Sequence, residues 1–543
     1  MRNRIPEIGS VIRELNLNSD FVEYYGKYSA KVSDFSLGNR PSRGKLILVS
    51  AITPTPAGEG KTTVSIGLAQ GLRKLGYRTA LALRQPSMGP VFGRKGTATG
   101  GGRSSLIPSD SINLHFTGDF HAITTAHNLL AAALDNGLYF KTLRIDPSKV
   151  LWKRVIDMND RALRHIQIGL TDQNSSGRNS AFDITSASEI MAILCLSENY
   201  DELRDRLNRI LVGFTPDMEP VFASQIRVTG ALLAVLREAL KPNIVQSSEG
   251  VPAFIHGGPF ANIAHGCNSI LATKMALENA DYVVTEAGFA FDLGGEKFLD
   301  IKCRQGQLAP DAIVLVVTIR ALKMHDGIKL ADLPAENASA VFSGLENLEA
   351  HLAAAKFFKR PITVAINRFS TDTSEEISVV QEFCRKQGIP CEIANVFSEG
   401  GDGALSLATC LVTATQQPSP RLPFVYALDE TIETKIEKIS KVIYGADGVD
   451  FTTEALDRLR IINSIGYGNL PICMAKTQES LSDNPRLLGR PKNFKITVRD
   501  FEISNGAGFL VALTGKLLRM PALPKVPSAE RIQMDSQGVI TGW

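Results

Sequence analysis

The sequence predicts an α/β protein with one large domain built on a mostly parallel sheet and two smaller α/β domains. The chain has 543 residues, and hydrophobic cores stop growing near roughly 250 to 300 residues, so we expect more than one domain. Continuous apolar runs, as expected of buried parallel strands, recur at residues 45–52, 281–286, 312–319 and 361–366. Gly-rich or polar loops and segments of helical periodicity follow several of these runs, which is the alternation that βαβ units produce.

The first βαβ unit is the clearest of these. Residues 45–52 read KLILVSAI and residues 77–84 read YRTALALR, two strands on either side of the amphipathic segment VSIGLAQGLRKLG. Helical periodicity also predicts helices near residues 190–211, 230–240 and 345–358.

Domain boundaries are expected near residues 350 and 515. A long helical stretch precedes the strand at 361–366, and the segment MPALPKVP at 520–527 reads as extended chain because proline fixes φ and removes a donor. The expected domains are residues 1–350, 351–514 and 515–543.

Composition indicates a folded protein with small-molecule ligands. The chain is 44% hydrophobic and 21% charged, close to the average of globular proteins. The net charge of +3 is too small to attract nucleic acid or anionic lipid, so we expect neither nucleic acid nor membrane as a partner. The seven cysteines form no CxxC pair, which fits reduced thiols. No signal-peptide core and no run of about 18 apolar residues is present, so the expected location is cytoplasmic.

The segment TPAGEGKTT lies between the first strand and the first helix. A standard phosphate loop reads GxxxxGK[ST], and Thr55 stands where its first glycine belongs, but the core GEGKTT is present. Gly58 and Gly60 allow the positive φ that a nest of N–H donors needs, and Lys61 opens a helix whose dipole favours anions. A tight turn capped by threonine is the alternative, but the order strand, loop, helix favours phosphate binding.

We therefore expect a P-loop-type domain. Lys61 would reach the β- and γ-phosphate oxygens, and the hydroxyl of Thr62 or Thr63 would contact Mg²⁺. Glu286, which ends the strand at 281–286, is a further candidate as a partner of the metal or of water. The residues expected to bind the nucleotide are Thr55, Pro56, Gly58, Glu59, Gly60, Lys61, Thr62 and Thr63.

Other polar segments fall where ligands bind in such sheets. Arg84 ends the second strand, at an edge that holds ligands in doubly wound folds. Its guanidinium suits a phosphate or carboxylate, with a surface salt bridge as the alternative. The glycine-rich run at 93–105 indicates a loop close to a ligand or to another backbone. The run FIHGGPFANIAHGCNS at 254–269 is polar but poor in charge, as a loop lining a buried site would be.

Taken together, the sequence resembles formate–tetrahydrofolate ligase, also called formyltetrahydrofolate synthetase. The blocks that carry the resemblance occur in one order over nearly the whole chain: AITPTPAGEGKTT, INLHFTGDFHAIT, LWKRVIDMNDRALR, PAFIHGGPFANIAHGCNSI, VTIRALKMH, IYGADGV, GYGNLPICMAKTQ and MPALPKVP. The resemblance implies an enzyme that depends on ATP and Mg²⁺, is stimulated by a monovalent cation (K⁺ or NH₄⁺), and joins formate to N10 of tetrahydrofolate. It also implies a homo-oligomer, either a dimer or a tetramer.

The resemblance further implies roles for individual residues. Formate would first be activated as formyl phosphate, and Lys61 and Arg84 match the family positions for this step. Phe369 and Phe397 would stack on the two faces of the pterin, so the domain of residues 351–514 would contribute to the folate site. A tryptophan commonly stands where Phe397 is.

Several residues depart from the family pattern. The glycine-rich signature GIKGGAAGGGY reads GRKGTATGGGR here, which keeps Lys95, and EAGFGADLG reads EAGFAFDLG. The unusual residues are Gln85, Arg94, Thr97, Thr99, Arg103, Thr125, Ala290, Phe291 and Asp326. The further candidates for substrate contact are Gln85, Lys95, Thr125, Ala290 and Phe291.

These departures leave two interpretations open. Loss of a tyrosine at Thr125 with gain of Phe291 suggests an exchange of volume within one pocket. The protein is either an ordinary ligase that has drifted or a paralogue with a different acid or amine acceptor, and Arg103 favours the paralogue because it introduces charge. A partitioning-type P-loop ATPase is opposed by the small net charge, and a catalytically silent subunit by the retained Lys61 and Arg84.

Overall fold

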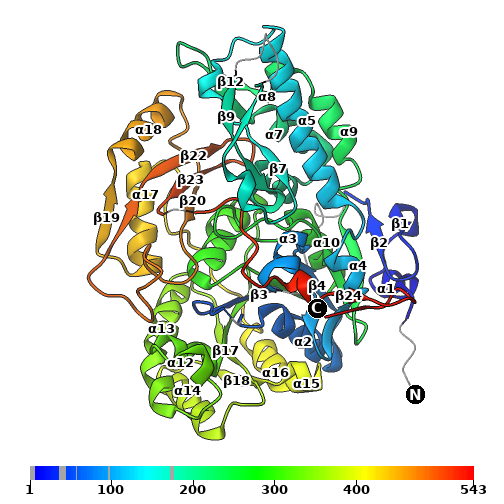
Figure 1. Ribbon diagram of the computed structural model, residues 1–543. Helices are drawn as coiled ribbons and strands as arrows, with labels where there is room; N and C mark the ends of the chain where they lie inside the picture. Colours follow the sequence, from blue (N-terminus) through cyan, green and yellow to red (C-terminus); the bar gives the residue numbers. More distant parts are fainter. Residues whose placement is uncertain are drawn as a thin grey trace.

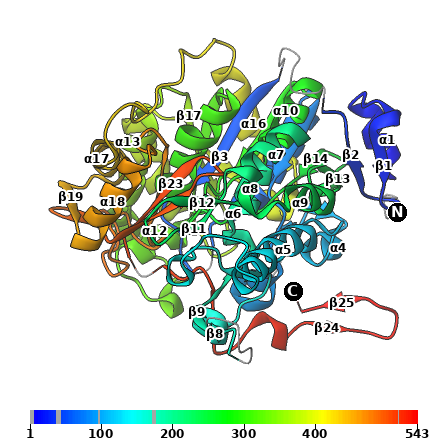
Figure 2. The same cartoon turned by 90° about the horizontal axis from the view of Figure 1, so that it is seen from above.

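The computed structural model describes residues 6–35, 44–56, 58–95, 98–170, 177–515 and 517–542. At its centre is a large sheet with the strand order β1-β2-β13-β14-β4-β15-β3-β16-β17-β18, in which β6 also pairs with β13 and β5 with β6. The N-terminal strand β1 and the later strand β19 lie at opposite sides of the molecule (Figures 1 and 2).

Seven neighbouring strands in the described part of this sheet run parallel, as the sequence predicts. In spatial order they are β14 (Pro252–Ile255), β4 (Thr79–Leu83), β15 (Tyr282–Glu286), β3 (Lys45–Ala51), β16 (Ala312–Val317), β17 (Ile362–Asn367) and β18 (Cys391–Ala394). The antiparallel part consists of β13 (Asn243–Ser247), β2 (Ala30–Val32), β1 (Val22–Tyr24), β6 (Ser104–Ile107) and β5 (Gly100–Gly101).

The parallel strands are apolar along their length because both faces of the sheet are covered. Successive side chains of a strand point to opposite faces, so Leu46 and Leu48 of β3 join one hydrophobic core. Ile47 and Val49 join the core on the other face. This double burial explains why these strands read as continuous apolar runs rather than as alternating ones.

Helices connect the strands and cover the sheet (Figure 1). The phosphate-loop helix α2 is Lys61–Lys74. The other main helices are α1 (Ile8–Glu14), α4 (Ser109–Asn113), α5 (Asp119–Tyr139), α10 (Ile270–Asn279), α12 (Ile319–His325), α13 (Ala338–Lys356), α14 (Ser374–Lys386), α15 (Val396–Glu399), α16 (Leu405–Ala414), α17 (Ile432–Ile439) and α18 (Thr453–Ser464). No helix within the described ranges is both long enough and apolar enough to cross a membrane.

The predicted helix at 190–211 is wrong, because the structure has two helices there. α6 (Glu189–Leu196) ends before α7 (Tyr200–Asn208), and Leu211 already belongs to β11 (Leu211–Phe214). The side chain of Asn199 accepts a hydrogen bond from the Glu202 N–H and starts a new helix. Asparagine competes with the helical backbone in this way and favours the cap. The predicted helix at 230–240 corresponds to the shorter α9 (Thr229–Leu236).

The large sheet continues past the predicted boundary at residue 350. β17 and β18 extend it beyond β16, so they belong to the same sheet as the phosphate-loop strand. Smaller sheets follow, formed by β19 (Gly448–Phe451) with β21 (Lys495–Val498), and by β20 (Ile472–Ala475), β23 (Phe509–Leu513) and β22 (Asp500–Ser504). The chain ends in a short hairpin of β24 (Gln533–Met534) and β25 (Ile540–Thr541), which lies at the periphery in Figure 2. The division into three domains stays a prediction.

Candidate active site

Five adjacent parallel strands deliver polar residues to one edge of the sheet. In the order β4, β15, β3, β16 and β17, their carboxyl ends lead to Arg84, Glu286, the phosphate loop, Thr318 and Asn367. Carboxyl ends of parallel strands point the same way, so side chains far apart in sequence converge there.

The phosphate loop has the backbone that its glycines predict. Gly58 and Gly60 have φ values of +75° and +71°, a region that favours glycine. The Gly58 N–H donates to the Thr55 carbonyl at 3.0 Å. A Cβ at Gly60 would lie 2.3 Å from Nδ2 of Asn367, so no other residue fits there. The loop is therefore packed against β17 as well as leading into α2.

Glu59 fixes the shape of this loop. Its carboxylate is buried and accepts hydrogen bonds from the Thr55 N–H at 2.9 Å, the Thr55 hydroxyl at 3.0 Å and the Thr318 hydroxyl at 2.5 Å. Its backbone carbonyl accepts from the Asn367 amide at 3.0 Å. The carboxylate of Glu59 thus organises the loop from inside. The sequence gives no sign of the contributions of Thr318 and Asn367, since neither residue belongs to a local motif.

The cations and the carboxylate of the site lie together. The Thr62 hydroxyl donates to Oε2 of Glu286 at 2.7 Å, and Nη2 of Arg84 lies 3.8 Å from Oε1 of the same carboxylate. Burial lowers the pKa of Lys61, and the carboxylates of Glu286 and Glu59 oppose this shift, whereas the positive charge of Arg84 adds to it. Arg84 and Thr62 therefore approach the same carboxylate, and Lys61 precedes Thr62 at the start of α2.

Arg84 lies in a close-fitting pocket of backbone. Its Nη1 donates to the Pro259 carbonyl at 3.5 Å, and a Cβ at Gly288 would lie 2.7 Å from that nitrogen. The Nε of Arg84 and the Oε1 of Gln85 are buried and have no hydrogen-bond partner within the described part of the protein. Buried polar atoms of this kind are usually satisfied by a ligand or by water. The run at 254–269 thus packs against the arginine, as a loop lining a buried site would.

The two phenylalanines expected at the pterin lie farther along the same edge. Phe369 follows β17 and is partly exposed, and Phe397 lies in α15, directly after β18, with 58% of its surface exposed. A Cβ at Gly101 would lie 3.1 Å from the Phe397 ring, and one at Gly102 would lie 2.1 Å from the Phe397 carbonyl oxygen. The hairpin of β5 and β6 thus needs glycines at these positions, because side chains there would collide with Phe397.

Arg103 lies on the outside of this hairpin. Its N–H donates to the Phe397 carbonyl at 2.9 Å, its carbonyl accepts from Gln70, and the residue is exposed. The hydrogen bond from Lys74 lowers the pKa of the exposed Asp402 carboxyl, and the charge of Arg103 adds a smaller effect in the same direction. Arg103 thus adds an exposed charge beside the backbone of Phe397.

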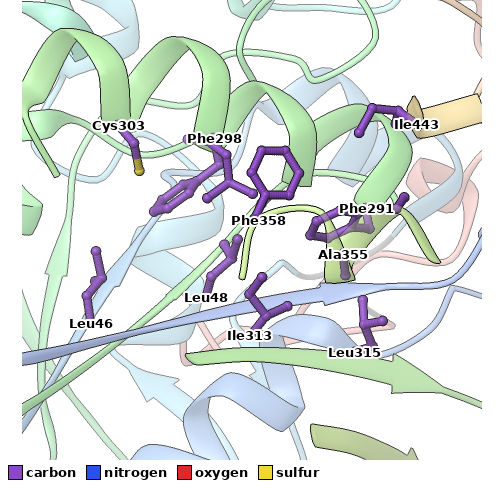
Figure 3. Close-up of a cluster of buried hydrophobic side chains, with 14 of the residues drawn as sticks. Leu46, Leu48, Phe291, Phe298, Cys303, Ile313, Leu315, Ala355, Phe358 and Ile443 are labelled. Carbon is purple, nitrogen blue, oxygen red and sulfur yellow. The ribbon is translucent and has the colours of Figure 1, made fainter. Parts of the chain in front are cut away.

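Phe291 and Thr125 do not share a pocket. Phe291 is fully buried in the core on one face of the large sheet, with its ring centroid 5.9 Å from that of Phe358. Figure 3 shows it in this core together with Phe358 and Ala355. Thr125 is exposed on α5. The predicted exchange of volume is wrong, because the added bulk points into the core instead of toward a ligand.

The remaining candidates are placed as follows. Ala290 is buried, and its carbonyl accepts hydrogen bonds from the N–H groups of Leu293 and Gly294. Pro56 is exposed at the turn of the phosphate loop, and Thr63 is half-buried on α2. The Lys95 side chain and Thr97 lie outside the described residues.

The oxygens of Thr62 and Glu286 fit a magnesium ion whose other ligands are phosphate oxygens and water. Within the described residues there is no group of three or more His, Cys, Asp or Glu side chains that could hold a metal on their own. Mg²⁺ is commonly bound by one or two protein oxygens together with substrate phosphates and water. One hydroxyl and one carboxylate 2.7 Å apart suit that mode of binding.

The full chain matches one family of known proteins. The model of the family described as formate–tetrahydrofolate ligase matches residues 1–543.

Proposed function

We infer residue roles from the premise that the chain belongs to the formate–tetrahydrofolate ligase family. The protein is therefore an ATP-dependent ligase that converts formate and tetrahydrofolate into 10-formyltetrahydrofolate, with release of ADP and phosphate. The roles below are our proposal.

The first step activates formate. A formate oxygen attacks the γ-phosphorus of ATP, the bond between that phosphorus and the oxygen of ADP breaks, and formyl phosphate forms. Two anions must approach each other, so the step needs fixed positive charge and an aligned geometry. We assign Lys61 to the transferring phosphoryl group and Arg84 to the oxygens of the acyl phosphate. The observation that carries this assignment is that Glu286 lies 3.8 Å from Arg84 and accepts a hydrogen bond from Thr62, the residue after Lys61.

We propose that Mg²⁺ is held by Thr62 and Glu286 together with phosphate oxygens. When bound, the ion would neutralise charge on the phosphates. The part played by the protein is to keep the two donor oxygens adjacent at the end of β15 and the start of α2.

In the second step N10 of tetrahydrofolate attacks the formyl carbon. The bond from that carbon to the phosphate oxygen breaks, phosphate leaves, and the proton of N10 passes to phosphate or solvent. We propose that the pterin stacks between Phe369 and Phe397, which hold it at the far end of the same sheet edge.

A steady-state assay tests the function. ADP release should require formate and tetrahydrofolate together, and 10-formyltetrahydrofolate should form in equal amount. A flat rate when both are saturating would contradict the assignment, and a panel of small carboxylates and reduced pterins would then identify a paralogue. Stimulation by DNA or lipid vesicles would instead favour a partitioning-type ATPase.

Four further properties stay proposals, two of them based on family membership and two on the sequence. They are activation by K⁺ or NH₄⁺, assembly into a homo-dimer or homo-tetramer, a cytoplasmic location, and the three-domain division. Ammonium titration of the rate tests the first property, and light scattering of the purified protein tests the second.

A further inference from the structure

One side chain touches both halves of the proposed site. Arg320 is the second residue of α12, and its Nη2 donates to the carbonyl of Gly58 in the phosphate loop at 3.1 Å. Its guanidinium carbon lies 3.6 Å from the ring centroid of Phe369. At this separation the cation lies against the face of the ring. Arg320 therefore joins the nucleotide loop to the ring proposed to hold the pterin.

The start of α12 gives this arginine a fixed base. Thr318 caps the helix by accepting from the Ala321 N–H at 3.1 Å, and its hydroxyl donates to Glu59. α12 is thus attached to the phosphate loop twice, through Glu59 and through Gly58. The cap limits how far Arg320 can move relative to the loop.

Two carboxylates surround the guanidinium at a distance that affects its pKa. Burial lowers the pKa of Arg320, while the carboxylates of Glu59 and Asp372 act in the opposite direction. The Asp372 carboxylate also accepts from the Phe369 N–H at 2.7 Å. One of these carboxylates belongs to the phosphate loop and the other to the turn that carries the aromatic ring.

The contact to Gly58 also controls a peptide group. A trans peptide is planar, so its carbonyl and its N–H point in opposite directions. Holding the Gly58 carbonyl toward Arg320 therefore turns the Glu59 N–H away from the arginine. Gly58, at φ +75°, is a residue whose backbone can rotate readily, so the orientation of this peptide depends on an outside contact.

We propose that Arg320 is a positioning residue that couples nucleotide binding to folate binding. The guanidinium covers one face of Phe369 and leaves the pterin the other, while it holds the Gly58–Glu59 peptide in a single orientation. A pterin that orders Phe369 also orders Arg320 and hence the loop, and a nucleotide that orders the loop does the reverse. This inference rests on the proposed function, because it takes Phe369 as a pterin platform.

Calorimetric binding tests this coupling without turnover. The affinity for Mg²⁺ and a non-hydrolysable ATP analogue is measured with and without tetrahydrofolate, and the ratio of the two dissociation constants is the coupling factor. For the unmodified protein we expect a factor of about five to thirty, and binding coupling must be reciprocal. Arg320→Gln should reduce the factor to within about twofold of one. Arg320→Lys, which keeps the charge but loses the planar stack, should give an intermediate value.

Two further variants separate the possible causes of a lost coupling factor. Arg368→Gln removes the exposed charge of the residue next to Phe369 and should leave the coupling factor unchanged. Equal loss in Arg368→Gln and Arg320→Gln would overturn the inference, because a general charge effect would explain both. Phe369→Ala should weaken tetrahydrofolate binding and abolish coupling.

The outcomes distinguish this inference from the proposed function. If Phe369→Ala weakens tetrahydrofolate binding but Arg320→Gln keeps the coupling factor of the unmodified protein, the folate site stands and the role of Arg320 is wrong. If Phe369→Ala leaves tetrahydrofolate affinity unchanged, the proposed folate site itself is wrong, and the inference fails with it. Thermal unfolding and far-UV circular dichroism confirm that each variant is folded before its binding is compared.

Discussion

At the phosphate loop, polar side chains are tied to one another by buried hydrogen bonds, whereas Phe397 at the far end of the sheet edge stands more than half in solvent. The loop must present donors to a highly charged ligand, and buried donors that are already oriented need no reorganisation when charge develops. The aromatic end is proposed to hold a flat ring by contact, which an open face does well. The difference indicates a rigid phosphate loop and an accessible surface at the proposed folate site.

Removal of the charge at the rigid end should have the largest effect. Lys61→Ala is expected to lower kcat by roughly 10²- to 10³-fold, as loss of one preorganised donor does in other enzymes. Lys74→Ala, at the other end of the same helix, removes only surface ion pairs with Glu249 and Asp402 and is the matched control. Formation of 10-formyltetrahydrofolate measures both. A comparable loss in Lys74→Ala would show that damage to α2 is responsible.

Acid should destabilise the fold through His351, which lies next to the segment that precedes the phosphate loop. His351 is fully buried, its Nε2 lies 3.0 Å from the Thr53 hydroxyl just before the loop, and burial lowers its pKa to about 4. An unfolded histidine titrates near 6.5, so the unfolded state takes up the proton first as pH falls. The stability that His351 contributes is therefore complete above about pH 6.5 and is lost toward pH 4, by at most roughly 1.4 kcal/mol per pH unit.

His351→Gln tests this pH dependence, because glutamine can bond to Thr53 without titrating. Between pH 7 and 5, the free energy of unfolding measured with urea should fall less steeply for the variant. The difference between the two slopes should be at most that of one bound proton, about 1.4 kcal/mol per pH unit. An unchanged slope would mean that other groups dominate the acid sensitivity.

Substitution at the exposed aromatic end should have a smaller effect, and this effect should be limited to tetrahydrofolate. Phe397→Ala is expected to raise the KM for tetrahydrofolate by about tenfold, because it removes one stacking face, and to leave the KM for ATP unchanged. Phe342→Ala is the matched control, since Phe342 is also an exposed phenylalanine, at 70%, but lies on α13. Phe397→Trp should retain binding. An equal rise in both KM values would contradict the separation of the two ends.

The smallest effect is expected at Arg103. Its side chain is exposed, so Arg103→Tyr should change kcat/KM for formate and tetrahydrofolate by less than about threefold. A larger change would reopen the interpretation of the protein as a paralogue with a reshaped acceptor site.

Much of the site was accessible from sequence because it follows from strand order. The apolar runs identify β3, β15, β16 and β17, and the shared edge of parallel strands brings Arg84, Glu286 and the start of α2 together. The positive φ values of the loop glycines were also predictable, because they follow from the local sequence alone.

The rest depends on contacts between distant segments. Thr318 reaches Glu59 across 259 positions, and Asn367 reaches it across 308, and no local pattern reports such pairs. Phe291 shows a second limit, since a substitution reveals added volume but not the direction in which the side chain points. Asn199 shows a third, because the same apolar periodicity continues across a capping residue that separates two helices.

The strand order also fixes a distance within the proposed site. Going from β15, which ends in Glu286, to β18, which precedes Phe397, the sheet advances by four neighbouring pairs, β15-β3-β16-β17-β18. With a spacing of about 4.8 Å per pair, this is roughly 19 Å. Backbone hydrogen bonds set this length, so surface mutations cannot stretch or shorten it. The distance between the proposed phosphate-binding and pterin-binding parts of the site is therefore a property of the backbone.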